Sequence, residues 1–198
     1  MRQVIAERAL KVGEFTLSSG GKSEFYFDLR PVLCNPMYAT LAADLICSWA
    51  EKNATTKERF DGGLQYQFVG CPAISGILLA SAMANAALVT SREWDAPYPS
   101  VLYYAPKKHG TGGDLHGGLR AGDQVLLVDD VLTTGRSLLE MIAAIKAAGG
   151  HIVRCCVLLD REAGGVEAIE AVGVPVRTVY TLRHFLHYIE AKKVLAKV

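Results

Sequence analysis

The sequence predicts an α/β protein in which a mostly parallel central sheet is flanked by helices. Apolar, strand-like runs alternate along the chain with helical patterns of about 10–15 residues, the order that βαβ units produce. One of these runs, residues 125–128, is apolar at every position, as in a parallel strand buried on both faces. A chain of 198 residues fits one domain with a substantial core.

The amino-terminal part of the chain is predicted to hold two helices with a hairpin between them. Residues 2–11 and 37–52 carry apolar side chains at helical spacing, and Pro36 suits the first turn of the second helix. Residues 15–19 and 24–29 are typical of short strands, and the two glycines between them favour a turn.

The rest of the chain alternates between strands and helices. We expect strands at 65–70, 100–104, 125–130, 151–160 and 176–180, and helices at 75–88, 137–150, 165–173 and 181–195. Residues 105–118 are the one long irregular segment, and irregular loops of that length tend to be functional or disordered. Because no internal repeat, low-complexity tract or linker is visible, we expect a single domain over 1–198.

Composition and charge exclude several classes of protein. The formal net charge is +1, so nothing draws the whole chain towards nucleic acid or membranes, and any anion binding has to come from local clusters. No apolar run reaches the roughly 18 residues that a membrane-spanning helix needs. The five cysteines form no CxxC pair, and reduced thiols are the better interpretation. We therefore expect a cytoplasmic protein.

The stretch VLLVDDVLTTGRS, residues 125–137, predicts a binding site for a sugar phosphate. Open α/β sheets bind ligands at the carboxyl ends of their strands, so Asp129 and Asp130 lie at the crevice and can accept hydrogen bonds from sugar hydroxyls. The turn that follows leads into a helix whose free N–H groups and dipole favour phosphate. Its residues are Thr133, Thr134, Gly135, Arg136 and Ser137.

Other interpretations of this stretch explain less of it. A solvated strand end followed by a helix cap accounts for each residue singly but leaves their joint pattern unexplained. Neither a Walker loop nor a GxGxxG fingerprint is present, so nucleotide binding of those kinds is not indicated.

The stretch 125–137 resembles the phosphoribosyl-pyrophosphate signature of the type I phosphoribosyltransferases. The resemblance implies that Asp129 and Asp130 contact the ribose 2- and 3-hydroxyls and that residues 133–137 bind the 5-phosphate. Three further stretches resemble parts of the orotate phosphoribosyltransferases: 13–30 the amino-terminal strand pair, 107–118 the mobile lid, and 158–165 the late strand with its Asp-Arg end. They imply an N-terminal hood over 1–35 and a lid over 103–118.

This resemblance implies a reaction in which a ring nitrogen of orotate displaces pyrophosphate from phosphoribosyl pyrophosphate, giving orotidine 5′-phosphate in pyrimidine nucleotide synthesis. Lys107 and His109 of the lid are candidates for stabilising or protonating the leaving group, and Arg161 for binding the orotate carboxylate. Further substrate-binding candidates are Lys108, Lys22, Phe27 and Ser75. The implied cofactor is Mg²⁺, held mainly by the substrate pyrophosphate. The implied assembly is a homodimer that shares its lid, with no nucleic-acid or membrane partner.

Arg161 is a candidate from the residues alone as well. It ends a strand next to the Asp129 strand and can face the same crevice, where a guanidinium matches a planar carboxylate through two hydrogen bonds. The alternative is a surface arginine paired with Glu162.

Four positions depart from the family pattern. Tyr103 and Tyr104 stand where the lid usually begins with cations, and Ser18 and Ser75 stand where lysines are common. The two tyrosines are either packing residues or hydroxyl contacts that replace the cations. Two other functions stay open, transfer to another base and a regulator that senses phosphoribosyl pyrophosphate without catalysis. The absence of a DNA-binding leader and of excess charge favours the enzyme.

Overall fold

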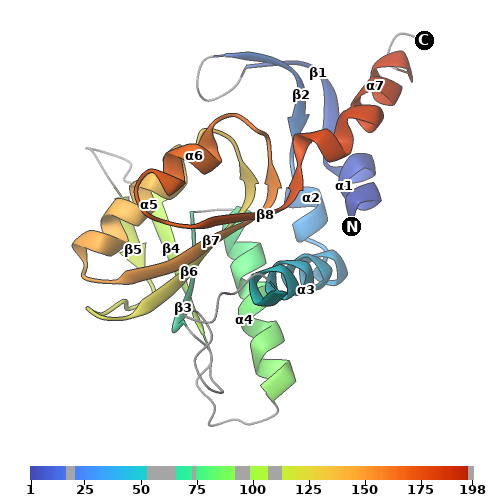
Figure 1. Cartoon of the computed structure of the whole chain (residues 1–198). Helices are drawn as coiled ribbons and strands as arrows, with labels where there is room; N and C mark the ends of the chain where they lie inside the picture. Colours follow the sequence, from blue (N-terminus) through green and yellow to red (C-terminus); the bar gives the residue numbers. More distant parts are fainter. Residues whose placement is uncertain (17–20, 53–65, 73–74, 92–98, 107–112, 196–198) are drawn as a thin grey trace.

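The structure is a computed structural model that describes residues 1–16, 21–52, 66–72, 75–91, 99–106 and 113–195 (Figure 1). The elements of the amino-terminal half are α1 Arg2–Arg8, β1 Leu10–Thr16, β2 Lys22–Phe27, α2 Arg30–Leu33, α3 Pro36–Lys52, β3 Phe68–Pro72 and α4 Ser75–Ser91. They are followed by β4 Ser100–Pro106, β5 Gly113–His116, β6 Gln124–Leu132, α5 Arg136–Ala147, β7 His151–Asp160, α6 Gly165–Glu170, β8 Val176–Thr181, the 3₁₀ helix η1 Leu182–Phe185 and α7 Leu186–Leu195.

The central sheet confirms the predicted fold class. Its strand order is β5-β4-β3-β6-β7-β8, and every neighbouring pair is parallel except β4–β5. Strand β6 therefore lies in the interior of the sheet, with β3 on one side and β7 on the other. This position explains the uninterrupted apolar run at 125–128, since a central parallel strand is covered on both faces.

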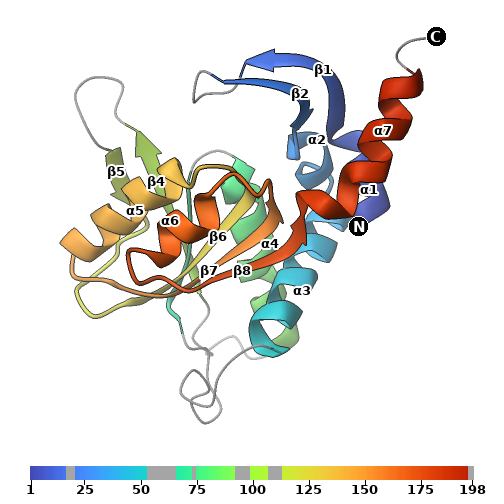
Figure 2. The same ribbon diagram turned by 45° about the horizontal axis from the view of Figure 1, so that its top comes forward.

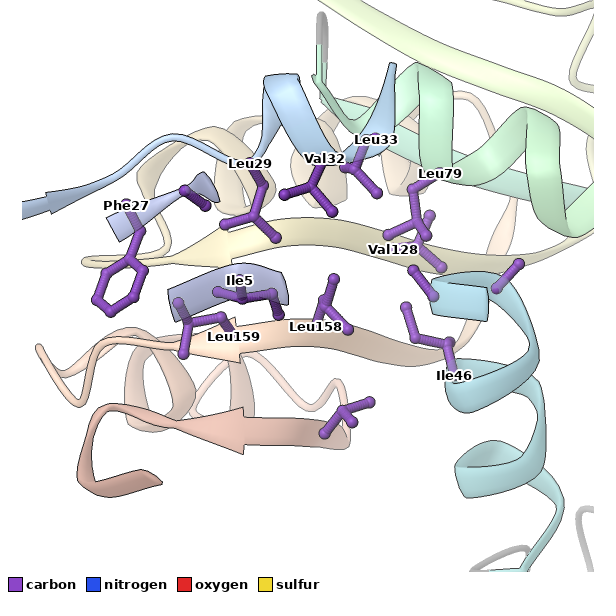
Figure 3. Packing of buried hydrophobic residues seen from close by; sticks show 14 of the residues in the cluster. Ile5, Phe27, Leu29, Val32, Leu33, Ile46, Leu79, Val128, Leu158 and Leu159 are labelled. Carbon is purple, nitrogen blue, oxygen red and sulfur yellow. The ribbon is translucent and has the colours of Figure 1, made fainter. Parts of the chain in front are cut away.

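Helices cover both faces of the sheet, and alternate side chains of each strand face different layers. Val128 and Leu158 point into one core cluster together with Ile46 of α3 and Leu79 of α4 (Figure 3). The intervening residues of β6 and β7 point into a second cluster with α5 and α6. Figures 1 and 2 show α5 and α6 lying across the sheet from α3 and α4.

The two-stranded antiparallel sheet β1–β2 is separate from the central sheet and stands beside α7 (Figure 2). Lys192 of α7 donates to the Leu10 carbonyl at 2.7 Å, and Lys193 forms an ion pair with Glu24 at 2.7 Å. Phe27 at the end of β2 packs edge-on against Phe185, with 5.2 Å between ring centroids. The hairpin is thus tied to the carboxyl-terminal helix and to the first core cluster.

Three local predictions were wrong. The first helix ends at Arg8 rather than residue 11, because Leu10 begins β1 and pairs with Phe27. Residues 105–118 are not irregular throughout: β4 runs to Pro106 and β5 pairs with it antiparallel, while residues 107–112 lie outside the described part. The short helix α2 was not expected, and the closing helix opens with the 3₁₀ turn η1.

Candidate active site

A cavity of about 550 Å³ opens where the carboxyl ends of β6 and β7 meet the hairpin β1–β2. Its polar lining comes from four separate parts of the chain. They are Thr16, Asp28 and Arg30 from the hairpin and the start of α2, Ser75 at the start of α4, Asp130 near the end of β6 with Thr133 and Thr134 after it, and Arg161 after β7. Residues up to 145 positions apart therefore face one space, as expected at the carboxyl edge of a parallel sheet.

A second hollow, of about 470 Å³, surrounds the turn between β6 and α5 and shares Thr133 and Thr134 with the first. Gly135 has φ +76°, which permits the sharp entry into the helix. The first hydrogen bond of this turn runs from Leu139 N–H to the Gly135 carbonyl, at 2.8 Å, so the amide groups before it have no helical acceptor. All five residues predicted to hold the phosphate, 133–137, line this hollow.

The two acidic residues open onto different spaces. Asp130 lines the first cavity, where its Oδ1 accepts a 3.0 Å hydrogen bond from the Ser75 hydroxyl. Asp129 lines the hollow around the turn, and its Oδ1 accepts the Asp130 backbone N–H at 2.9 Å. Burial raises the pKa of Asp129 well above its usual value, and the neighbouring Asp130 charge adds to the effect. Asp129 therefore binds a proton more readily than a carboxylate in water would.

Arg161 is buried at the wall of the first cavity, with 9% of its surface exposed. Its Nη2 donates to the Ser23 hydroxyl at 3.1 Å, and its Cζ lies 5.0 Å from the centre of the Phe25 ring. The surface alternative is wrong, because the Glu162 carboxylate is engaged by Arg183 at 2.9 Å. Burial lowers the pKa of Arg161, and no ion pair joins it to any residue that the structure describes.

Asp28 and Arg30 form a charged pair at the cavity that sequence reasoning missed. Asp28 accepts Arg30 Nε at 2.7 Å and Nη2 at 3.0 Å, and Lys11 Nζ at 3.2 Å. The Arg30 hydrogen bond, opposed by burial and helped by Lys11, lowers the pKa of Asp28 to about 2. The sequence signal for this pair was an acid and an arginine two residues apart, directly after a hairpin strand.

Aromatic side chains of the hairpin cover part of the same cavity. Tyr26 is 38% exposed and its ring lies 5.7 Å from that of Phe15, so this pair faces the open space. Phe27, predicted to contact substrate, lines the cavity but is 3% exposed and belongs mainly to the core. Lys22, at the start of β2, is exposed and does not line the cavity.

The positions that depart from the family pattern have structural partners. Ser75 bonds Asp130, as described above, and Tyr104 is 4% exposed in the second core cluster. Tyr103 stacks on His116 of β5, with ring centroids 4.7 Å apart. Tyr104 is therefore a packing residue. The remaining predicted residues Ser18, Lys107, Lys108 and His109 lie outside the described part of the chain.

Three further observations concern metals, membranes and cysteines. Within the described ranges, no three His, Cys, Asp or Glu side chains come together to form a metal site. None of the helices that the structure describes is long and apolar enough to cross a bilayer. All five cysteines are free thiols.

Asp129, Asp130 and the turn at residues 133–137 lie at the carboxyl edge of the parallel sheet. Residues 50–174 match the phosphoribosyl transferase domain family, which gives the class of the protein. An orotate phosphoribosyltransferase from Pyrococcus furiosus is 36% identical over 173 residues, which cover 87% of this chain and 86% of that protein. The chain belongs to the orotate phosphoribosyltransferases of this family.

Solved structures agree with this assignment. The orotate phosphoribosyltransferase from Aeropyrum pernix superposes with a TM-score of 0.74 at 29% identity, over 96% of this chain and 97% of its own. The enzyme from Mycobacterium tuberculosis, solved in complex with phosphoribosyl pyrophosphate, superposes with a TM-score of 0.65 at 26% identity, over 92% and 94% of the two chains.

Proposed function

We propose that this protein transfers the phosphoribosyl group from phosphoribosyl pyrophosphate to orotate, releasing pyrophosphate and orotidine 5′-phosphate. The observation that carries the proposal is the buried Arg161 guanidinium, which faces the same cavity as Asp130 and the Thr133 turn and has no described ion-pair partner. Burying a charge in this way costs free energy unless a ligand supplies the missing hydrogen-bond partners. The planar carboxylate of orotate is such a ligand, and it matches the guanidinium through two hydrogen bonds.

The phosphoribosyl group would lie along the edge of β6. The amides and hydroxyls of residues 133–137 would bind the 5-phosphate at the amino terminus of α5, where the helix dipole favours an anion. Asp130 and Asp129 would accept hydrogen bonds from the two ribose hydroxyls. Because Ser75 already holds one oxygen of Asp130, the other oxygen stays available for the sugar.

The chemical step exchanges one bond at the anomeric carbon for another. A ring nitrogen of orotate donates its electron pair to that carbon while the bond to the diphosphate oxygen breaks, and the leaving diphosphate takes the bonding pair with it. The N–H proton of the attacking nitrogen is released to solvent or to the departing diphosphate. Positive charge develops on the sugar ring, so the neighbouring Asp130 carboxylate stabilises the transition state. Tyr26 and Phe15 offer a ring surface against which a flat base can stack while water is excluded.

The negative charge on the leaving group needs cations. Lys107, Lys108 and His109 of the proposed lid, residues 103–118, would supply them from the segment that joins β4 to β5. Mg²⁺ would be held here mainly by the substrate diphosphate, together with the Asp130 carboxylate, since the other carboxylate at the cavity, Asp28, is engaged by Arg30 and Lys11. When bound, the ion would neutralise the charge that accumulates on the diphosphate.

The assembly and location follow as further parts of the proposal. A homodimer in which each lid reaches the partner's cavity would supply the cations that Ser75, Tyr103 and Tyr104 do not. The five free thiols support a reducing compartment, and we propose the cytoplasm. Sedimentation of the purified protein, with and without substrate, tests the dimer.

The direct test is turnover of orotate. Purified protein is mixed with phosphoribosyl pyrophosphate, Mg²⁺ and orotate, and the loss of orotate absorbance is followed. The Asp130→Asn and Arg161→Ala variants should lose at least about 100-fold in kcat/KM, since each removes a charged partner of the substrate. Arg183→Ala is the matched control, because Arg183 is exposed and lines no part of the cavity.

The possible outcomes separate three functions. Turnover that depends on both Asp130 and Arg161 supports orotate as the substrate. Binding of phosphoribosyl pyrophosphate together with turnover of a different base overturns the choice of orotate. Binding without turnover of any base indicates a sensor and overturns catalysis.

A further inference from the structure

We propose that Ser23 and Phe25 of the hairpin are positioning residues that orient the Arg161 guanidinium for a planar carboxylate. The inference deepens the proposed function and rests on it for the identity of the ligand. Neither residue lines the cavity, so both would act on the substrate only through Arg161. They lie 138 and 136 positions before it in the chain and reach it because β2 crosses the carboxyl end of β7.

The direction of the Ser23 hydrogen bonds is fixed by its surroundings. A serine hydroxyl has one proton to donate. Ser23 donates that proton to the Phe25 carbonyl at 2.7 Å, the shortest of its contacts, and accepts from Arg161 Nη2 at 3.1 Å and from the Phe25 backbone N–H at 3.4 Å. The lone pairs of the oxygen are thereby turned towards the guanidinium, and the oxygen cannot rotate away without losing the bond within its own strand.

The Phe25 ring fixes the plane of the same guanidinium. It lies 5.0 Å from Arg161 Cζ, within the range of a cation–π contact, which is stronger when the cation is shielded from water. The ring is itself held: it meets Phe27 edge-on at 6.0 Å, and Phe27 packs against the fully buried Phe185. Phe25 is thus linked through Phe27 to the hydrophobic core.

The consequence concerns the donors that remain. An arginine has five N–H donors in a rigid fork, and Ser23 occupies one of them. The backbone of Arg161 is also fixed, because its N–H donates to the Leu132 carbonyl at 2.9 Å. The Arg161 backbone, one of its N–H donors and one face of its guanidinium are therefore held. Its other donors are presented to the cavity in one orientation. Preorganisation of this kind lowers the entropic cost of binding a carboxylate.

A purely structural role for Ser23 makes a different prediction from a positioning role. If Ser23 only stabilises the hairpin, its loss lowers the melting temperature and affects all substrates alike. If it positions Arg161, its loss affects the base that carries a carboxylate and leaves phosphoribosyl pyrophosphate unaffected. The effect also disappears when Arg161 is absent, since no donor is left to orient.

The experiment measures KM and kcat for orotate, for phosphoribosyl pyrophosphate and for uracil, a base without the carboxylate, in Ser23→Ala, Ser23→Thr and Phe25→Leu. We expect Ser23→Ala to raise KM for orotate about tenfold, the effect of one hydrogen bond to a charged group. KM for phosphoribosyl pyrophosphate should change less than twofold, and the preference for orotate over uracil should fall. Ser23→Thr, which keeps the hydroxyl, should restore the orotate KM.

Two controls isolate the contact. Ser48→Ala removes a serine hydroxyl that bonds a carbonyl at 3.0 Å within α3, away from the cavity. Glu24→Ala removes the ion pair between the hairpin and Lys193 without touching Arg161. In the Arg161→Ala background, Ser23→Ala should add less than a twofold change, because coupled residues are not additive. Equal effects of Ser23→Ala in both backgrounds overturn the proposal.

A readout without catalysis separates this inference from the proposed function. In protein labelled with ¹⁵N-arginine, the solvent exchange of the Arg161 side-chain N–H protons is measured by NMR. We expect exchange to accelerate about tenfold in Ser23→Ala and to remain slow in Ser48→Ala. Unchanged exchange overturns the positioning role. Accelerated exchange in a protein that does not turn over orotate leaves the positioning role standing and overturns the substrate.

Discussion

Gly165 gives the most specific test of how the turn at residues 133–137, the proposed phosphate site, is held in place. A Cβ at this position would overlap the Thr133 carbonyl oxygen and would lie 2.8 Å from both Cγ and Cδ1 of Leu132. Ordinary contact begins at 3.4 Å. Because the obstructing atom is backbone, the Gly165→Ala variant forces either α6 or the turn to move by about 1 Å, a displacement that can cost on the order of 100-fold in an active site.

The expected result is a selective loss of affinity. KM for phosphoribosyl pyrophosphate should rise about 10- to 100-fold in Gly165→Ala, because residues 133–137 shift relative to Asp130, whereas KM for orotate should change little. Overpacking of this kind costs roughly 1–3 kcal/mol of unfolding free energy. For a chain of this length, that corresponds to a fall in melting temperature of roughly 2–12 °C. Steady-state kinetics and calorimetry measure the two effects.

The neighbouring glycine is the matched control. Nothing lies within 4 Å of a Cβ at Gly164, but its φ of +86° strains any other residue. Gly164→Ala should therefore lower stability by roughly 1 kcal/mol through the backbone and leave KM for phosphoribosyl pyrophosphate within twofold of the parent. A Gly165→Ala variant with unchanged KM, or equal rises in KM for both variants, would refute the steric argument.

Three more predictions concern charge. The pKa of Asp28 is about 2 in the folded protein against 3.8 for the ordinary side chain, so its contribution to stability is complete above about pH 4.5 and is lost as pH falls towards 2. In Asp28→Asn, the fall in the free energy of unfolding over this pH range, measured by chemical unfolding, should therefore be smaller by about 1–2 kcal/mol. Arg30→Gln should raise KM for phosphoribosyl pyrophosphate several-fold, since Arg30 lines the cavity, while Lys11→Gln, which removes the other cation bound to Asp28, should not. Removal of Mg²⁺ with a chelator should abolish turnover reversibly, and readdition of Mg²⁺ without recovery of activity would contradict the role given to the ion.

The fold class and the turn at residues 133–137 could be predicted because each depends on local pattern. The apolar run 125–128 and the Asp129-Asp130 pair lie together in sequence, and the topology of parallel sheets places their end at a crevice. Strand β5 was missed because it has only four residues, too few for alternation to be visible. The bounds of β1 were missed because Leu10 fits the spacing of a helix as well as the buried end of a strand.

Contacts between distant segments were beyond sequence reasoning. The Ser23–Arg161 hydrogen bond joins residues 138 positions apart and depends on how the hairpin is seated over the sheet, which no local pattern encodes. The Asp28–Arg30 pair was visible as a spacing, but its position at the cavity depends on the short helix α2. For Tyr104 the sequence left two alternatives open, a packing residue or a hydroxyl contact, and its burial in the core decides for packing.

Asp130 and Arg161 line the same cavity, but no ion pair between them is among those of the described residues. Asp130 and Arg161 face one space, yet a different serine hydroxyl engages each of them, Ser75 for the acid and Ser23 for the guanidinium. A direct ion pair would satisfy both groups more fully, but it would neutralise the two charges that the substrates need. The serine hydroxyls are neutral, and each is bonded to one atom of its charged group, Oδ1 of Asp130 or Nη2 of Arg161. Under the proposed function, substrate hydroxyls would bind the other oxygen of Asp130, and a base carboxylate would bind the other donors of Arg161. Ligands that bind at both ends of the cavity together should therefore raise the melting temperature further than either ligand alone.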